Sequence, residues 1–197
     1  MRHLSAGDAR LAGIIARVGP WKIPRIGEPF TALCRSIVHQ QLGMKAAAVI
    51  YGRLAALCPR RQPTPTKILA LSEGELRTIG LSRQKSAYLR NLAEHFADGS
   101  LRTATLRRMN DEEVIAAATQ VKGVGRWTAE MLLIFSLGRL DVLPVGDFGL
   151  RSAVQKTYRM RGLPKPKRIA KLAKPWQPYR SVATWYLWRS LDTPNPA

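Results

Sequence analysis

Apolar and polar residues alternate with a helical period along nearly the whole chain. No stretch shows the strict two-residue alternation that is typical of a half-buried β-strand. The sequence therefore predicts an all-α protein. The expected helices span residues 6–17, 29–40, 45–57, 82–97, 112–120, 126–137, 148–158, 167–173 and 179–191.

Several residues mark helix ends. Ser82 and Asp111 are placed to accept hydrogen bonds from the amides of a first helical turn, and Pro65 and Pro178 suit helix entry. The segment "CPRRQPTPT" is expected to be a loop, and the proline-rich residues 192–197 are expected to be frayed. A chain of 197 residues suits one large domain or two small lobes, with a core that needs neither metal nor disulfide.

The charge of the chain is strongly positive and unevenly distributed. It has 32 Lys and Arg against 13 Asp and Glu, a formal net charge of +19, and no acidic residue between Asp147 and Asp192. This imbalance predicts a basic face and a polyanionic partner. Because no run of about 18 apolar residues could cross a bilayer, nucleic acid is a better candidate than a membrane.

The cysteines and histidines do not form a metal-binding pattern. Cys34 and Cys58 are isolated, without a CxxC motif, and the three histidines are scattered along the chain. We therefore expect no zinc or iron–sulfur ligand set. The thiols are expected to be reduced, as in the cytoplasm of a bacterium or in a nucleus, and the first fifteen residues are unlike a signal peptide.

The stretch "VKGVGRWTAEMLL" places two glycines directly before a predicted helix. Glycines allow positive φ and remove bulk that would keep another backbone away, so the amides of Gly123, Gly125 and Arg126 should point outward, where a phosphate is favoured. A dinucleotide fingerprint would need a preceding strand and a third glycine, and a P-loop would need a GK[ST] sequence. An ordinary interhelical turn stays open as an alternative at this point.

The next segment, "LGRLDVLPVGDFGLRSAV", puts a single carboxylate, Asp147, at the start of a helix. We call the "VKGVG" turn between the helices expected over residues 112–120 and 126–137 the hairpin. The order of this hairpin, a Gly/Pro loop and then an Asp resembles the helix-hairpin-helix DNA glycosylase superfamily. "FTALCRSIVHQQLGMKAAAVIYGRL", "IGLSRQKSAYLRNLA" and "KPWQPYRSVATWYLW" look like its alkylbase branch, the 3-methyladenine DNA glycosylase II type. The resemblance extends from about Phe30 to Trp188, and the chain has no room for the N-terminal β-rich domain of the larger members.

The resemblance implies a compact fold of two lobes with the active site in the cleft between them. Lobe A would span about residues 29–140, and lobe B would combine residues 1–28 with 141–191. Asp147 matches the catalytic aspartate of the family. An anion about 4 Å from the positive charge that develops at C1′ of the sugar is worth ~4 kcal/mol at an effective dielectric constant of 20, about a thousandfold in rate.

Further site residues follow from the resemblance. Trp127 stands where bifunctional members have a Schiff-base lysine, which implies a hydrolase without lyase activity. The implied base pocket consists of Trp127, Met131, Trp188 and Trp185, although a core position is about as plausible for each tryptophan. The implied DNA contacts come from Lys122, Gly123, Val124, Gly125, Arg126 and Thr128. The residues implied to fill the gap left in the duplex are Gln41 and Leu42, and the carbonyls that match a monovalent cation site are those of Thr119, Val121 and Val124.

The sequence thus predicts a DNA glycosylase, active as a monomer, that flips an alkylated purine out of duplex DNA and hydrolyses its glycosidic bond. No cofactor and no catalytic metal are expected. Two alternatives stay open: a non-catalytic protein that binds DNA structures through the same hairpin, and a glycosylase for neutral deaminated bases such as hypoxanthine or uracil.

Overall fold

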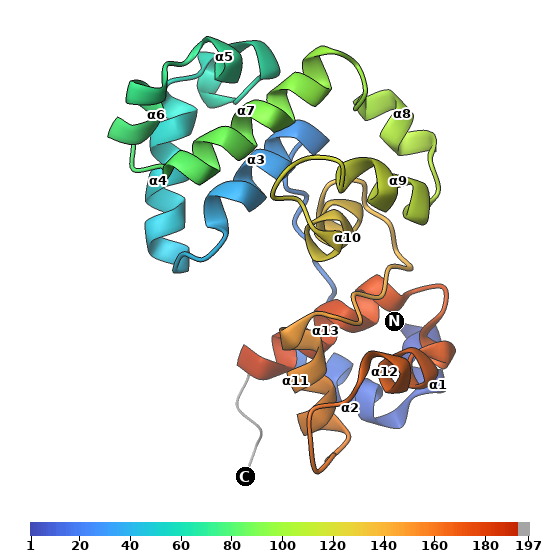
Figure 1. Cartoon of the computed structure of the whole chain (residues 1–197). Coiled ribbons are helices and arrows are strands. Elements are labelled where there is room, and N and C mark those ends of the chain that lie inside the picture. Colours follow the sequence, from blue (N-terminus) through green and yellow to red (C-terminus); the bar gives the residue numbers. More distant parts are fainter. Residues whose placement is uncertain (193–197) are drawn as a thin grey trace. The chain divides into compact units, whose positions relative to one another are not determined.

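The computed structural model describes residues 1–192, and within them it contains helices and no β-strand (Figure 1). Two short 3₁₀ helices, η1 (Pro59–Arg61) and η2 (Lys174–Trp176), accompany the α-helices. The α-helices are α1 (Arg2–Gly7), α2 (Ala9–Val18), α3 (Pro29–His39), α4 (Met44–Ala56), α5 (Pro65–Ala70), α6 (Glu73–Thr78), α7 (Arg83–Ala97), α8 (Thr103–Arg108), α9 (Asp111–Ala118), α10 (Arg126–Phe135), α11 (Phe148–Thr157), α12 (Pro166–Leu172) and α13 (Arg180–Asp192).

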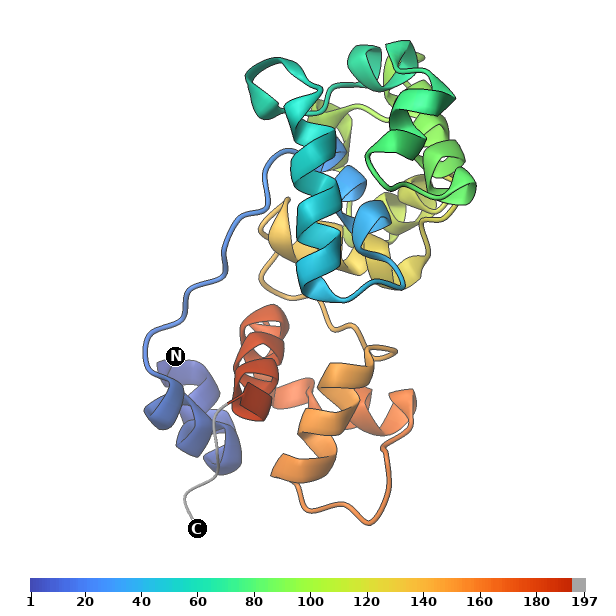
Figure 2. The same cartoon turned by 90° about the vertical axis from the view of Figure 1, so that its left-hand side faces the viewer.

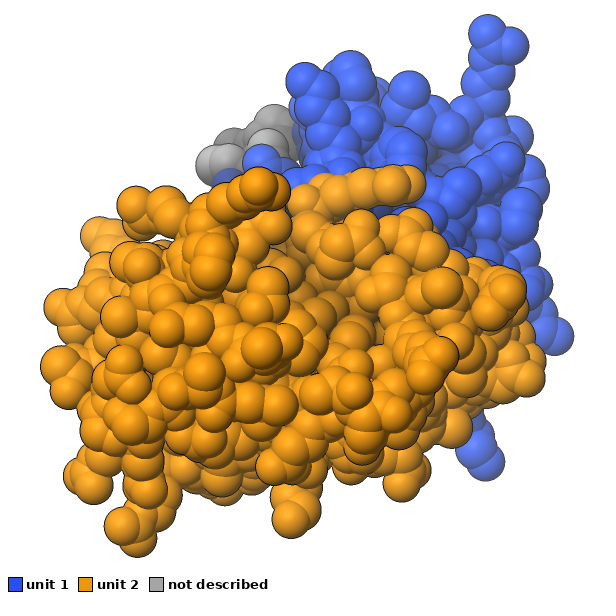
Figure 3. All heavy atoms as spheres, turned by 90° about the horizontal axis from the view of Figure 1, so that it is seen from above, with its two compact units in different colours: residues 1–24, 138–197 blue, residues 25–137 orange. Residues whose placement is uncertain are grey.

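The chain divides into two compact units (Figure 3). Unit 1 combines Met1–Pro24 with the chain from Gly138 onward, and unit 2 is the continuous segment Arg25–Leu137. Unit 2 is therefore inserted between the two segments that build unit 1.

Unit 2 is built around α7, which packs against α3, α5 and α6. Ser82 caps α7 by accepting a hydrogen bond from the Lys85 amide at 3.2 Å, and Pro29 occupies the first turn of α3, where its missing N–H costs nothing. The core is formed by apolar side chains that recur at helical spacing, among them Leu33, Ile37, Leu54, Ile68, Leu76, Leu89, Leu92, Val114, Leu132 and Leu133.

Unit 1 packs α13 against α2 and α11, and Figure 2 shows α11 in orange and α13 in red. Asp8 links its two chain segments. The carboxylate caps α2 by accepting hydrogen bonds from the amides of Arg10 and Leu11, and it also accepts from the Tyr158 hydroxyl and the Trp176 indole. The core of this unit consists of Leu4, Leu11, Ile14, Leu150, Ala153, Val154, Ile169, Ala173, Trp176, Val182, Ala183, Tyr186 and Leu187.

The all-α prediction is confirmed, with three corrections. The helix expected over residues 6–17 is interrupted at Asp8, because that side chain caps a new helix. Asp111 is not a cap; Asn110 accepts from the Glu113 amide and forms a capping box with it. The 3₁₀ turn η1 falls within the segment that was expected to be a loop, whereas Pro65 begins α5, as expected from its suitability for helix entry.

The helices α6 and α8 were not predicted, and of α5 only the entry at Pro65 was. Each has six residues, which is too short for a 3.6-residue period to stand out. The expected frayed end lies outside the described residues apart from Asp192, the last residue of α13. No helix in the described part of the chain is long and apolar enough to span a membrane.

Candidate functional site

Glycine occupies positions 123 and 125, between α9 and α10, for two different structural reasons. Gly123 has φ +83°, and a Cβ there would lie 2.2 Å from the Tyr88 ring, so this position requires glycine for the fold itself. Gly125 is the N-cap of α10 with φ −93°, a backbone conformation that other residues also adopt. A Cβ at Gly125 would meet no atom within 4 Å, so its missing side chain leaves open space at the helix start.

Side chains from other elements of unit 2 hold the turn around Gly123 in place. The Lys122 amide donates to Asn91 Oδ1 at 2.9 Å, and the Gln40 side-chain amide donates to the Gly123 carbonyl at 2.8 Å. The side chains of Val121 and Val124 are buried. A turn held in this way keeps the first amides of α10 in one orientation, with the positive end of the helix dipole behind them.

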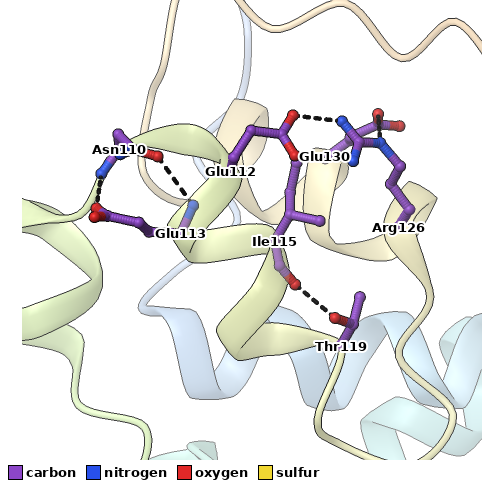
Figure 4. A network of polar contacts seen from close by, with 7 residues as sticks. All are labelled: Asn110, Glu112, Glu113, Ile115, Thr119, Arg126 and Glu130. Carbon is purple, nitrogen blue, oxygen red and sulfur yellow. Dashed lines mark hydrogen bonds and ion pairs between the residues drawn. The ribbon is translucent and has the colours of Figure 1, made fainter.

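Arg126 joins α9 to α10 (Figure 4). Its guanidinium forms a two-point contact with Glu112, at 2.6 and 3.0 Å, and a third contact with the buried Glu130 at 3.2 Å. The hydrogen bond from Arg126 lowers the pKa of Glu112. The guanidinium is thus engaged by two carboxylates, which leaves the backbone amide of Arg126 as the group for the DNA contact expected from the sequence.

Trp127 and Met131 lie four residues apart on α10 and therefore share a face of that helix. Trp127 is 48% exposed and Met131 is partly exposed, so neither is a core residue of unit 2. Thr128 has a buried side chain. Of the expected DNA contacts, Thr128 can therefore offer only its amide.

The turn between α3 and α4 carries Gln41 and Leu42. Both are exposed, and Gln41 has φ +56°, which places it in the left-handed region. Lys85 supports this turn from α7, because its ammonium donates to the carbonyls of Val38 and Gln40 at 2.7 and 2.6 Å. Burial lowers the pKa of Lys85. Since Gln40 also binds Gly123, the turn and the hairpin are connected within unit 2.

In unit 1, Asp147 is the N-cap of α11, as expected from the sequence. Its Oδ1 accepts hydrogen bonds from the Leu150 amide at 2.6 Å and from the Trp188 indole N–H at 2.8 Å. The structure thus brings together two of the predicted site residues that are far apart in the sequence. The carboxylate is partly exposed.

Two neighbours of Asp147 were missed by the sequence analysis. A Cβ at Gly149 would lie 3.2 Å from both Asp147 Oδ1 and Trp188 Cδ1, so glycine permits their close approach. Phe148 is 71% exposed in the first turn of α11. The repeated glycine in "GDFG" was visible in the sequence, but only the contact with a residue of α13 gives it a reason.

Trp185 lies three residues before Trp188 on α13. It packs edge-to-face on Tyr186 with 4.9 Å between ring centroids. It also lines a hollow of unit 1, of about 530 Å³, together with Val18, Pro20, Lys22, Pro24 and Arg189.

Among the carbonyls expected to face a monovalent cation, that of Val121 accepts a hydrogen bond from the Val124 amide at 3.0 Å. A carbonyl oxygen has two lone pairs, so this bond leaves one for another partner. Carbonyl oxygens are hard donors that suit such an ion. Within residues 1–192 no cluster of His, Cys, Asp and Glu could hold a metal ion.

Comparison with known proteins places these features in a family. The family described as "HhH-GPD superfamily base excision DNA repair protein" matches residues 34–178. A curated protein of Schizosaccharomyces pombe, DNA-3-methyladenine glycosylase 1, is 36% identical over 193 residues, which are 95% of this chain and 85% of that protein.

Solved structures give the same result. The fold is similar to that of S. pombe 3-methyladenine DNA glycosylase (Mag1) in complex with abasic DNA, with a TM-score of 0.89, 34% identity and coverage of 99% of this chain and 97% of the other. It is also similar to a DNA-3-methyladenine glycosidase from Bacillus halodurans, with a TM-score of 0.87, 39% identity and coverage of 98% and 88%.

Proposed function

Because the chain belongs to the HhH-GPD superfamily of base excision DNA repair proteins, we propose that it is a DNA glycosylase for alkylated purines of the 3-methyladenine and 7-methylguanine type. It binds duplex DNA, flips the damaged nucleotide out of the stack and hydrolyses the N-glycosidic bond, which leaves an abasic site. The observation that carries the proposal is the Asp147 carboxylate, held at the start of α11 by the Leu150 amide and the Trp188 indole.

Asp147 stabilises the transition state electrostatically. Loss of the base builds positive charge at C1′ of the deoxyribose, and a fixed carboxylate about 4 Å away contributes ~4 kcal/mol, or about a thousandfold in rate. Its two hydrogen bonds hold Oδ1 in place, so little reorganisation is needed during the reaction. The same carboxylate orients the attacking water.

The alkylated base supplies its own activation. Methylation at N3 of adenine or N7 of guanine makes the ring cationic, so the base leaves without the general acid that O-glycosidases use. The aromatic faces proposed to contact the base, Trp127 and Trp188, also favour a cation by ~0.5–2 kcal/mol each. Met131 and Trp185 complete the proposed set of base contacts.

The hairpin is the proposed phosphate-binding element. The amides of Gly123, Gly125, Arg126 and Thr128 and the ammonium of Lys122 provide its donors, and the open space at Gly125 allows a backbone to approach. Gln41 and Leu42, exposed at the turn after α3, are proposed to fill the gap in the duplex. The carbonyls of Thr119, Val121 and Val124 are proposed to hold a monovalent cation, which would add positive charge near the phosphate.

The test compares the wild-type protein with Asp147→Asn on methylated duplex DNA, with the released bases separated by chromatography. Asn can keep the N-cap through its side-chain oxygen, so the fold should survive while the charge is lost. We expect release of 3-methyladenine and 7-methylguanine to fall about a thousandfold and DNA affinity to be kept. Asp192→Asn, which changes an exposed carboxylate of the same unit, is the matched control and should release bases at the wild-type rate.

Selectivity and reaction type are tested on defined duplexes. We expect cationic bases to be released much faster than hypoxanthine or uracil, and equal rates would contradict the cation-selective contacts. With Trp127 where a lyase needs an amine, borohydride should trap no covalent complex with DNA.

We also propose that the protein acts as a monomer of 21.9 kDa, in the cytoplasm of a bacterium or in a nucleus, and light scattering would test its mass.

A further inference from the structure

Unit 1 contains a second feature that the proposed reaction does not use, a cationic hollow of about 550 Å³. Its walls are α2, the end of α11 with the residues that follow, and the last turn of α13. Its charged lining residues are all basic: Arg10, Arg17, Lys156 and Arg159. We call these four residues and the space between them the α2–α11 hollow.

The backbone directs these cations toward one space. Arg10 and Arg17 are seven residues apart and therefore lie on the same face of α2, with Gly13 between them. Gly13 also lines the hollow, and a Cβ there would make an ordinary van der Waals contact with the Arg17 guanidinium at 3.9 Å. Arg159 follows α11 with φ +51°, a left-handed conformation that is uncommon for a residue other than glycine.

The four charges are not balanced by acids of the protein. Within residues 1–192, none of the four side chains forms an ion pair. Asp8 is close in the sequence, but its carboxylate accepts hydrogen bonds from two backbone amides, the Tyr158 hydroxyl and the Trp176 indole. Asp192 is paired with Arg189.

Helix dipoles do not remove this excess. Arg17 and Lys156 lie in the last turns of α2 and α11, where each helix end contributes about half a negative charge. Two such ends, about one negative charge in total, face four positive side chains. The hollow therefore keeps a clear positive excess and favours an anion.

We propose that the α2–α11 hollow binds a backbone phosphate of the same DNA that Asp147 acts on, as a second anchor in addition to the hairpin. Asp147 caps the first turn of α11 and Lys156 lies in its last turn, so at 1.5 Å per residue the two are about 13.5 Å apart along the helix axis. Duplex DNA carries about eight charges over that length. This inference rests on the proposed function, because it assumes that DNA lies at Asp147.

Part of the acid-free stretch between Asp147 and Asp192 lines the hollow. Lys156 and Arg159 come from that stretch, and α2 adds two arginines from the other chain segment of unit 1. The basic face expected from the sequence is thus assembled from two segments. An acidic segment of a protein partner would fit the same charges, but DNA is the polyanion that the family binds.

The experiment measures the affinity of the full chain for an undamaged 25-base-pair duplex over a range of salt concentrations. The test variant is Arg17→Gln/Arg159→Gln, and the control is Arg60→Gln/Arg61→Gln, which removes two exposed arginines from η1 in unit 2. Each lost phosphate contact makes the slope of log affinity against log salt less steep by about 0.9. We expect a change of about 1 to 2 in the test variant, with affinity roughly tenfold lower at 0.1 M salt, and little change in the control.

Two results would overturn the proposal. A slope equal to that of the wild type would show that the hollow neutralises no phosphate, and equal changes in both variants would show that only net charge matters. Circular dichroism confirms that the variants are folded, which is expected because all four substituted side chains are exposed. The readout is binding, so a wild-type protein that bound DNA but released no base would contradict the proposed function separately.

Discussion

At the residue scale, the position of the Asp147 carboxylate depends on a neighbour without a side chain. Gly149 lets Trp188 approach Asp147 closely enough for the 2.8 Å hydrogen bond, since a Cβ would lie 3.2 Å from both groups. The indole and the carboxylate would then have to move apart by a few tenths of an ångström. Catalysis by a single charge is sensitive to such displacements because the stabilisation depends on distance.

We therefore predict that Gly149→Ala lowers the single-turnover rate of base release by roughly tenfold to a hundredfold. Affinity for undamaged DNA should change little, because the substitution removes no charge. Gly162→Ala is the matched control: it lies in the same unit and a Cβ there meets no atom within 4 Å. A Gly149→Ala protein that releases bases at the wild-type rate would show that this contact does not position the carboxylate.

At the scale of elements, the two glycines of the hairpin separate a requirement of folding from a proposed requirement of DNA binding. Gly123→Ala combines strain at φ +83° with a 2.2 Å clash against Tyr88, so we expect a clearly lower melting temperature. Gly125→Val has open space around its Cβ, so we expect nearly unchanged melting but weaker DNA binding. Thermal unfolding and DNA titration of both variants test this. Wild-type affinity in a folded Gly125→Val protein would argue against the hairpin as a phosphate site.

Helix α7 supports two turns of unit 2, the turn after α3 and the hairpin between α9 and α10. Lys85 holds the carbonyls before Gln41, Tyr88 packs on Gly123, and Asn91 binds the Lys122 amide. We predict that Lys85→Met weakens binding to a duplex with an abasic-site analogue roughly tenfold, while binding to undamaged duplex changes less, because in the proposed function only the former engages the turn after α3. Lys171→Met, on an exposed position of α12, is the control. Equal losses on both duplexes would indicate a general structural role for Lys85.

The elements also show what the sequence could and could not predict. The long helices and the Ser82 and Asp147 caps followed from period and composition, because they depend on neighbouring residues. The contacts of Gly149 with Trp188, and of Gln40 with Gly123, join residues far apart in the chain and had no local signal. Arg126 illustrates the same limit, since no local signal predicted that its guanidinium pairs with Glu112 and Glu130.

At the scale of the whole molecule, the two units carry different natural probes. Cys34 and Cys58 are buried in unit 2, where burial raises the pKa of both thiols, whereas Trp21, Trp176, Trp185 and Trp188 lie in unit 1. Thiol labelling therefore reports on unit 2, and tryptophan fluorescence reports mainly on unit 1. A raised thiol pKa leaves little reactive thiolate until the unit opens.

Because each unit has its own core, we predict that the two probes follow different unfolding transitions in urea. The measurement is the fraction of labelled thiol after a short pulse, compared with fluorescence at each urea concentration. Cys34→Ala and Cys58→Ser would show which thiol reports the transition. Coincident curves would mean that the units unfold as one cooperative body.

The insertion of unit 2 between the segments of unit 1 has a consequence for synthesis on the ribosome. Helices α1 and α2 emerge first, but their partners α11 and α13 come after the whole of Arg25–Leu137. At 5–20 residues per second this delay lasts roughly 6 to 23 s. Throughout it Leu4, Leu11 and Ile14, which end up completely or almost completely buried, have no core to join. The nascent chain should therefore offer an apolar N-terminal segment to chaperones while unit 2 is already folding behind it.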